Sequence, residues 1–302
     1  KNFFPTPGAD IAAFESMVQN GDYYYVNFNV NPNGSVGTTV LSNQAAVAKQ
    51  GAAVKVAVQR VMEVTGKDKV ILVTGAGDGI GKEAALTYAR YGATVILLGK
   101  TVNKLTAVYD EIVAKGGQEP AIVPLDLKGA TAKHYRDMAA TIEAEFGRLD
   151  GVLHNAGILG VLSPFEHIDL ATWNDIMQVN VTSAMLMTQA LIPLLKRTSA
   201  ASVVFTSSGV GRKGRAFWGP YAVSKFSTEG LMQVMADEFE NSSIRVNCIN
   251  PGATRTKMRS KAYPGEDVSK LKTAADLMWL YLYLMSDDSN DVNGQSLDAQ
   301  PK

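Results

Sequence analysis

Short apolar runs alternate with longer amphipathic stretches over most of the chain, from about residue 67 onward. Runs rich in β-branched residues predict strands at residues 70–73, 94–98, 121–125, 151–154, 203–206 and 245–249. Helices are expected between them, at residues 81–91, 102–115, 131–146, 171–196 and 220–241. Because strands that alternate with helices of this length form βαβ units, the pattern predicts an α/β fold with a doubly wound parallel sheet.

The first 66 residues follow a different pattern and predict an N-terminal extension. Residues 23–30 are aromatic and β-branched, which predicts a strand, and residues 43–65 predict a helix with one apolar stripe. Residues 23–48 carry no charged side chain. This change predicts a boundary, with the extension at residues 1–66 and one larger domain at residues 67–302.

Composition limits the classes of partner. The chain of 302 residues has 29 Lys and Arg and 29 Asp and Glu, so its formal net charge is zero. This balance argues against a general electrostatic grip on nucleic acid or on an anionic membrane. The single cysteine, Cys248, excludes an internal disulfide and a multi-cysteine metal site. With no membrane span or signal peptide recognised, we expect a cytoplasmic protein without a metal.

The first predicted strand leads directly into a glycine-rich turn. Residues 74–81 read T-G-A-G-D-G-I-G, and a helix is expected after them. Glycine lacks a Cβ, so the turn can be tight and its N–H groups can approach a pyrophosphate at the positive end of the helix. The strand before and the helix after favour a dinucleotide site over a plain loop.

The second predicted strand ends in Gly99 and Lys100, with no acidic residue beside them. An acid at this place usually binds the ribose 2′-hydroxyl of NAD, whereas a basic residue accommodates the 2′-phosphate of NADP. Lys100 therefore favours NADP(H) over NAD(H), with a solvated loop lysine as the alternative.

Tyr221 and Lys225 lie four residues apart at the start of a predicted helix, so they share one helix face. A phenol has a pKa of about 10, and a nearby lysine cation lowers that pKa. The pair could exchange a proton with a carbonyl or alcohol oxygen, although Y-x-x-x-K alone is common by chance. Ser208, at the end of an earlier strand, could hydrogen-bond the same oxygen. Residues 154–157 and 250–256 follow two other strands, at the edge where doubly wound sheets bind ligands.

Together these motifs carry a family resemblance. In order they read T-G-x-x-x-G-I-G, N-A-G, S-S, Y-x-x-x-K and P-G-x-x-x-T, and residues from about 67 to 300 resemble a short-chain dehydrogenase/reductase. The sequence at residues 207–215 and 247–252 is similar to that of a bacterial branch of the family, the YciK-type oxidoreductases. The resemblance implies a single Rossmann-type domain and an NAD(P)-dependent enzyme that acts on a small carbonyl or alcohol.

The resemblance also implies roles for individual residues. Tyr221 is the general acid/base, Lys225 lowers its pKa and holds the nicotinamide ribose, Ser208 orients the carbonyl, and Asn180 positions a proton-relay water. Tyr221 and Lys225 belong to the cofactor site as well. The other expected cofactor contacts are Gly75, Asp78, Gly79, Ile80 and Gly81 at the pyrophosphate, Lys100, Asp126 near the adenine, Leu127, Asn155, Ala156, Gly157, Pro251, Gly252, Thr254, and Thr256 at the carboxamide.

Several features have two interpretations. His154 replaces the asparagine of many relatives, and packing under the cofactor is favoured over catalysis. Basic residues on two loops near the expected mouth could favour an acidic substrate, with solvated charges as the default: Arg212, Lys213, Arg215, Arg255, Lys257, Arg259 and Lys261. The long helix at 171–196 pairs between subunits in relatives, so a homodimer or homotetramer is expected; simple packing on the sheet is the alternative.

Two other function classes are weighed against the enzyme. A dinucleotide sensor on the same fold has no need of the tyrosine–lysine pair, which counts against it. Residues 1 to about 73 resemble a fragment of a lipase-type α/β-hydrolase, but no G-x-S-x-G serine elbow occurs in the chain. We therefore expect residues 1–66 to be non-catalytic, either as a fused fragment or as an extension that covers a sheet edge or an interface.

Overall fold

The computed structural model describes residues 25–30, 36–41 and 68–301. The chain divides into two units, Lys1–Thr65 and Gly66–Lys302. In the first unit, β1 (Tyr25–Val30) and β2 (Val36–Leu41) form an antiparallel pair in which Tyr25 lies opposite Leu41. The sequence predicted the first of these strands and missed the second. The helix expected at 43–65 lies outside the described residues.

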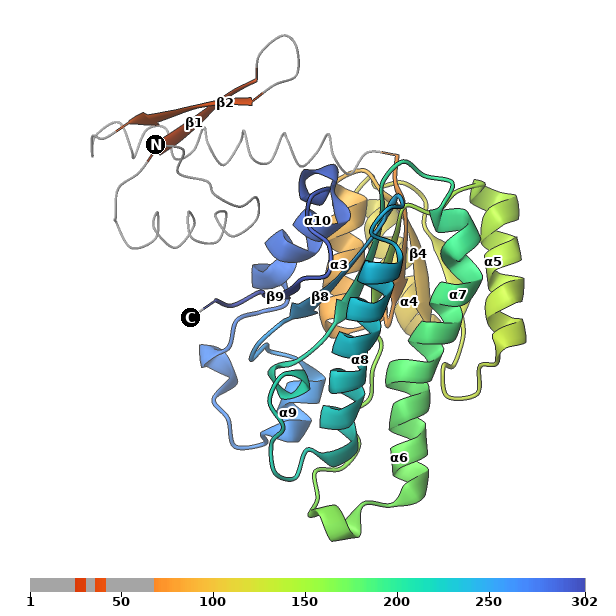
Figure 1. The fold of residues 1–302 in the computed structure, drawn as a ribbon, viewed down its shortest axis with the longest axis vertical. Helices are drawn as coiled ribbons and strands as arrows, with labels where there is room; N and C mark the ends of the chain where they lie inside the picture. Colours follow the sequence, from red (N-terminus) through yellow and green to blue (C-terminus); the bar gives the residue numbers. More distant parts are fainter. Residues whose placement is uncertain (1–24, 31–35, 42–67, 302) are drawn as a thin grey trace. The chain divides into compact units, whose positions relative to one another are not determined.

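A seven-stranded parallel sheet forms the centre of the second unit (Figure 1). Its order is β5-β4-β3-β6-β7-β8-β9, so the chain leaves β3 toward one edge and returns to β6 on the other side. The bounds are β3 (Val70–Thr74), β4 (Thr94–Gly99), β5 (Ala121–Pro124), β6 (Gly151–His154), β7 (Ala201–Thr206), β8 (Ile244–Asn250) and β9 (Ser296–Asp298). The predicted doubly wound fold is confirmed; β9 was not predicted.

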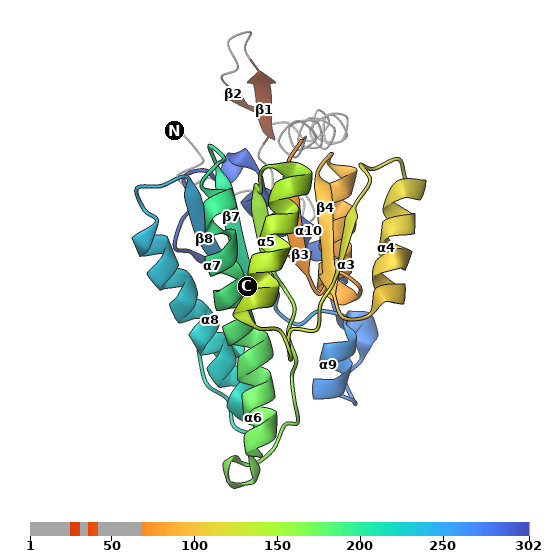
Figure 2. The same ribbon diagram turned by 90° about the vertical axis from the view of Figure 1, so that its right-hand side faces the viewer.

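Helices cover both faces of the sheet (Figure 2). One layer holds α3 (Gly79–Arg90), α4 (Val102–Ala114) and α10 (Met278–Met285), and the other holds α5 (Ala132–Phe146), α7 (Ser183–Leu195) and α8 (Gly219–Glu238). The single helix expected at 171–196 is wrong in one respect: a π-helical turn at Gln178–Thr182 separates α6 (Leu170–Met177) from α7. A short helix, α9 (Lys257–Ala262), follows β8.

The strands are apolar because both faces of the sheet are covered. Every residue of β3 and β7 is buried, and Leu72, Val73 and Leu97 have no exposed surface. The all-apolar α10 is likewise buried almost throughout, which explains its lack of a polar face. None of the helices in the described part of the chain is long and apolar enough to cross a membrane.

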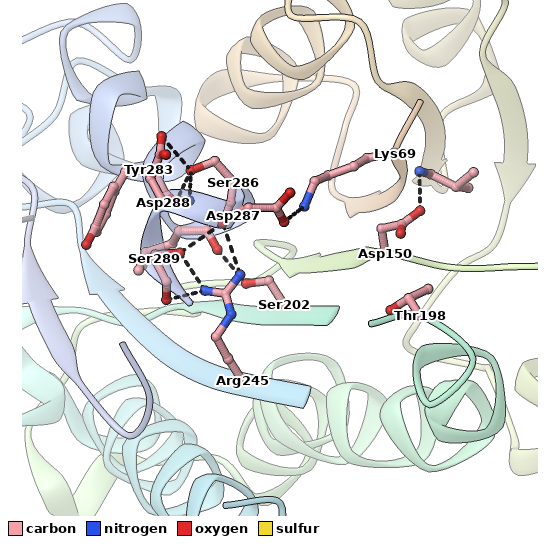
Figure 3. Close-up of polar contacts among 12 residues, drawn as sticks. Lys69, Asp150, Thr198, Ser202, Arg245, Tyr283, Ser286, Asp287, Asp288 and Ser289 are labelled. Atoms are coloured by element: carbon pink, nitrogen blue, oxygen red, sulfur yellow. Dashed lines mark hydrogen bonds and ion pairs between the residues drawn. The ribbon is translucent and has the colours of Figure 1, made fainter. Parts of the chain in front are cut away.

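A cluster of polar side chains lies at the amino ends of the central strands (Figure 3). The buried Arg245 guanidinium donates to the carbonyl oxygens of Ser286 at 3.0 Å and Ser289 at 2.6 Å. Lys69 Nζ lies 2.6 Å from Asp287 Oδ1, and Asp150 Oδ2 accepts from the Val70 N–H at 2.8 Å. The Arg245 and Lys69 bonds tie β8 and the start of β3 to the segment after α10, and the Asp150 bond joins the starts of β6 and β3, so the cluster stabilises this end of the sheet.

Candidate active site

An open cleft lies at the opposite end of the strands, at the carboxyl ends of β3, β6, β7 and β8. Strand order reverses between β3 and β6, and doubly wound sheets bind ligands at that point. Most of the sequence-predicted site residues line this cleft: Gly75, Asp78, Gly79, Ile80, Asn155, Ala156, Gly157, Ser208, Tyr221, Lys225, Pro251, Gly252, Thr254 and Thr256.

The glycine-rich turn connects β3 to the start of α3 and fits a pyrophosphate. Gly75 and Gly79 have φ of 67° and 56°, a backbone conformation that favours glycine. A Cβ on Gly81 would lie 2.3 Å from the Gly75 carbonyl oxygen, so a side chain there would force the turn open. Gly81 therefore lies behind the cleft wall and supports it, and the positive amino end of α3 lies at the cleft.

Asp78 caps the amino end of α3 and forms ion pairs with two lysines. Its Oδ1 accepts from the Gly79 N–H at 2.9 Å, while Lys104 Nζ at 2.6 Å and Lys257 Nζ at 2.8 Å meet its Oδ2. The hydrogen bonds from Lys104 and then Lys257 lower the pKa of the Asp78 carboxyl to about 2. Asp78, Lys104 and Lys257 together carry a net positive charge beside the expected phosphate site.

Tyr221 and Lys225 come from the first turns of α8 and are both buried among the residues that line the cleft. Lys225 Nζ donates to the Thr206 carbonyl oxygen at 2.6 Å, at the end of β7, and lies 5.6 Å from the centre of the Tyr221 ring. Ser208 lies two residues beyond β7. Helix and strand therefore bring the three predicted side chains to one wall, although they are separated along the chain.

Burial dominates the acid–base properties of this pair. It raises the pKa of the Tyr221 phenol to about 12, with the Ser208 hydroxyl acting in the opposite direction. It also lowers the pKa of the Lys225 ammonium to about 8, against the field of Cys248 and Glu229. The expectation of a depressed tyrosine pKa is thus not met in the protein alone, because loss of solvent around the phenol outweighs its polar contacts.

Asn180 lies in the π-helical turn, behind the cleft. Its Oδ1 accepts from the Ile158 N–H at 2.8 Å, and its Nδ2 donates to the Ile158 carbonyl and to Ser224 Oγ, both at 3.0 Å. A separate small cavity with room for about one water touches Asn180, Thr206 and Lys225. A proton-relay water held by Asn180, as the family resemblance implies, would have a polar space here.

Comparison with known proteins identifies the family. A family model described as short chain dehydrogenase matches residues 69–267. The chain is 56% identical over 234 residues to the uncharacterized oxidoreductase YciK of Escherichia coli K12, covering 78% of this chain and 92% of that relative. This chain belongs to the short-chain dehydrogenase family. Because the match to the family model starts at residue 69, the hydrolase resemblance of the N-terminal segment stays a prediction.

Two solved family members contain a cofactor. A short chain dehydrogenase from Shigella flexneri 2a, in complex with NADP, is 56% identical with a TM-score of 0.76, over 78% of this chain and 98% of that one. A second, from Escherichia coli CFT073 in complex with NADPH, has the same identity, TM-score and coverage.

Some predicted residues lie outside the cleft of this short-chain dehydrogenase. Lys100 and Asp126 are exposed, just past β4 and β5, and Leu127 is buried against the small cavity that touches Asn180. His154 is buried as expected: its Nε2 lies 2.8 Å from Thr188 Oγ1, and its ring stacks on Phe205 at 4.8 Å. Burial lowers its pKa to about 3, so it stays neutral.

Sequence reasoning missed two features of this dehydrogenase site. Trp218, three residues before Tyr221, lines the cleft with Leu159. Glu229 lies two helical turns after Tyr221, is buried, and accepts hydrogen bonds from Ser207 Oγ and from Ser296 Oγ, the latter at 2.8 Å. The spacing 221, 225, 229 along one helix face could have pointed to this carboxylate.

Most of the basic residues near the mouth have partners within the chain. Arg212 contacts Asp298 at 2.8 Å, and Arg255 donates to the carbonyls of Val268, Ser269 and Leu271. The ion pairs of Lys257 with Asp78 and of Arg259 with Glu266 take up two further cations. These pairs weaken the case for an acidic substrate.

Proposed function

We propose that this protein is an NADP(H)-dependent oxidoreductase that transfers a hydride between nicotinamide and a carbonyl or alcohol substrate, with Tyr221 as the general acid/base. The observation that carries the proposal is that Ser208, Tyr221 and Lys225 line the same cleft as the glycine-rich turn. A site built only to bind a dinucleotide would need the turn but not the buried phenol and amine.

The bound cofactor would supply the hydride to the carbonyl carbon and leave as its oxidised form. Ser208 would hydrogen-bond the carbonyl oxygen, and Tyr221 would donate its proton to that oxygen to give the alcohol. With a pKa raised to about 12 by burial, Tyr221 is protonated near neutral pH and thus ready to act as the acid. The neighbouring Lys225 ammonium would then stabilise the phenolate until solvent returns the proton through the small cavity.

We infer NADP(H) rather than NAD(H) from two independent supports. Relatives 56% identical to this chain are solved with NADP and NADPH. In this chain Lys100 is exposed directly after β4, where the ribose of the dinucleotide lies in doubly wound folds.

We further infer a homo-oligomer in the cytoplasm. The outer face of α8 exposes Val223, Phe226 and Val234 at 41%, 45% and 64%, an apolar stripe that a second copy could cover. Light scattering of the full chain at micromolar concentration should give a multiple of 32.3 kDa. A monomer at all concentrations would contradict the oligomer without affecting the proposed reaction.

The test of the reaction is a panel of carbonyls and alcohols with NADPH and NADH, followed by absorbance. We expect carbonyl reduction with NADPH at a kcat/KM at least about tenfold above that with NADH, because a 2′-phosphate gains a charge-assisted contact. Lys100→Glu should remove that preference, whereas Lys133→Glu, an exposed lysine on α5, should not. A clear preference of the unmodified protein for NADH would contradict the cofactor assignment.

A further inference from the structure

The cleft continues past Ser208 and Tyr221 into a region with an apolar wall. Leu159, Trp218, Met258 and Ala262 line this end. The Trp218 ring centre lies 5.9 Å from that of Tyr221, with the planes tilted by 55°. A substrate whose oxygen reaches the Tyr221 hydroxyl would therefore lay the group beside its carbonyl against the indole.

Aromatic and cationic contacts hold this wall from behind. Trp218 packs on Tyr263 at 5.9 Å between ring centres, and the Arg259 guanidinium lies 3.8 Å from the Tyr263 ring centre. Arg215 donates to the Tyr263 hydroxyl at 2.5 Å. An aromatic side chain fixed on several sides is a preformed surface, so little ordering cost remains when a flat apolar group binds.

Two of the cations that line this end of the cleft already have carboxylates beside them. Arg259 makes two hydrogen bonds to Glu266, at 2.6 and 2.5 Å, and this pairing lowers the pKa of the Glu266 carboxyl, which keeps it ionised. Lys257 is paired with Asp78. An anionic substrate would lose its hydration against Trp218 and Leu159, and it would have to compete with Glu266 and Asp78 for Arg259 and Lys257, which is unfavourable.

The approach to the wall is also apolar. Phe217, next to Trp218, is 60% exposed, and its carbonyl accepts from the Ser163 N–H at 3.1 Å. That bond brings the segment of Val161, itself 73% exposed, to the same side. Exposed apolar residues at the rim of a cleft are typical of a binding surface for an apolar ligand.

We propose, on the basis of the proposed reaction, that the substrate is an uncharged carbonyl compound, or its alcohol, that carries an apolar ring beside the reacting carbon and seats that ring against Trp218. Reduction adds a hydride to the carbonyl carbon and a proton from Tyr221 to its oxygen, so the ketone becomes the secondary alcohol and NADPH becomes NADP⁺.

The experiment compares acetophenone with 4-acetylbenzoate, which has the same ring and ketone plus a carboxylate, using the full chain and NADPH. We expect kcat/KM for acetophenone to be at least about tenfold higher. Trp218→Ala should lower it at least about tenfold for acetophenone and much less for 2-butanone, and Trp218→Phe should restore most of it. Trp279→Ala, at a half-buried tryptophan on α10 outside the cleft, is the matched control. It should leave the ratio of kcat/KM for acetophenone to kcat/KM for 2-butanone unchanged.

Equal or better use of 4-acetylbenzoate, or no effect of Trp218→Ala on acetophenone, would overturn the substrate class while the proposed reaction stands. Calorimetric titration of both compounds into the NADP⁺-loaded protein separates the two claims. Acetophenone binding that depends on Trp218 without any turnover would support the substrate class and contradict the reaction. No acetophenone binding would overturn the substrate class, even if other carbonyls were reduced.

Discussion

The amino and carboxyl ends of the parallel strands, called here the amino edge and the carboxyl edge of the sheet, use the same residue types in opposite ways. At the amino edge, Lys69 is 7% exposed and meets the Asp287 carboxylate at 2.6 Å, and Arg245 donates to two backbone carbonyls (Figure 3). At the carboxyl edge, Lys225 is 5% exposed, and among the described residues it donates to the Thr206 carbonyl but forms no ion pair. The first arrangement braces the sheet, whereas the second keeps a charge next to a phenol.

The buried Lys225, which forms no ion pair within the described part of the chain, lowers the free energy of unfolding but serves the proposed reaction. Burial lowers the pKa of Lys225 to about 8, so between about pH 8 and its ordinary value of 10.5 the unfolded chain binds more protons than the folded one. The free energy of unfolding therefore rises with pH in this window as far as Lys225 is concerned. In the same window the lysine loses its charge, so activity should fall while stability gains.

The largest expected effect comes from exchanging the two buried lysines for methionine. Lys225→Met should lower kcat/KM on the order of 10³-fold, since a general acid without its cation is ineffective, and should leave the free energy of unfolding equal or higher. Lys69→Met should keep kcat/KM and lower the free energy of unfolding by about 1 kcal/mol. Steady-state kinetics and urea unfolding of both variants measure this. Loss of turnover in Lys69→Met would contradict the claim that only the carboxyl edge takes part in the reaction.

A second test addresses the brace at the amino edge. Arg245→Met removes the guanidinium donors to the Ser286 and Ser289 carbonyl oxygens, which keep one further donor each, Ser289 Oγ and the Val292 N–H. We therefore expect a loss of about 1.5–3 kcal/mol in the free energy of unfolding. Turnover per folded molecule should not change. Arg136→Met, at an exposed arginine on α5, is the control and should have almost no effect. A stability change below about 0.5 kcal/mol in Arg245→Met would contradict the bracing role.

A third test is a pH dependence from His154, which packs beneath the carboxyl edge and acts only at acidic pH. Its pKa falls from 6.5 to about 3 because of burial, so the unfolded chain binds the extra proton between these values. Stability should be full above about pH 6.5 and decline as the pH falls toward 3, by at most about 1.4 kcal/mol per pH unit. His154→Gln should reduce this slope, and His134→Gln, at an exposed histidine, should not. An unchanged slope in His154→Gln would show that the ring is not held neutral.

The sequence predicted the sheet well where burial leaves a clear apolar run. β3, β4, β6, β7 and β8 are such runs, because helices cover both faces of the sheet, whereas β5 at its edge is only half-buried. β9 has three residues, too few to show a period, and α10 is apolar all round, so neither could be recognised as an element. The π-helical turn at Asn180 keeps the apolar spacing of a helix nearly intact, so it was read as one continuous helix.

In the candidate site, the order of the motifs along the chain predicted which side chains lie together in the cleft. It did not predict which other residues surround them. Tyr221, Lys225 and Ser208 share the cleft as expected, since each follows a strand or begins a helix at one edge. The raised pKa of Tyr221 could not be predicted, because it depends on how fully Trp218 and its neighbours exclude water. Likewise, the loop arginines and lysines near the mouth look free in the sequence, and only the fold brings Glu266, Asp78 and Asp298 beside them.

The most direct test of the central claim replaces one tyrosine at each edge by phenylalanine. Tyr283, at the amino edge, has a buried hydroxyl without a hydrogen-bond partner among the described residues, so Tyr283→Phe should keep kcat and leave stability equal or higher. Tyr221→Phe should still bind NADPH and lose kcat by at least about 10³-fold. Turnover that survives in Tyr221→Phe would contradict the account and favour a protein that binds the dinucleotide without using this tyrosine.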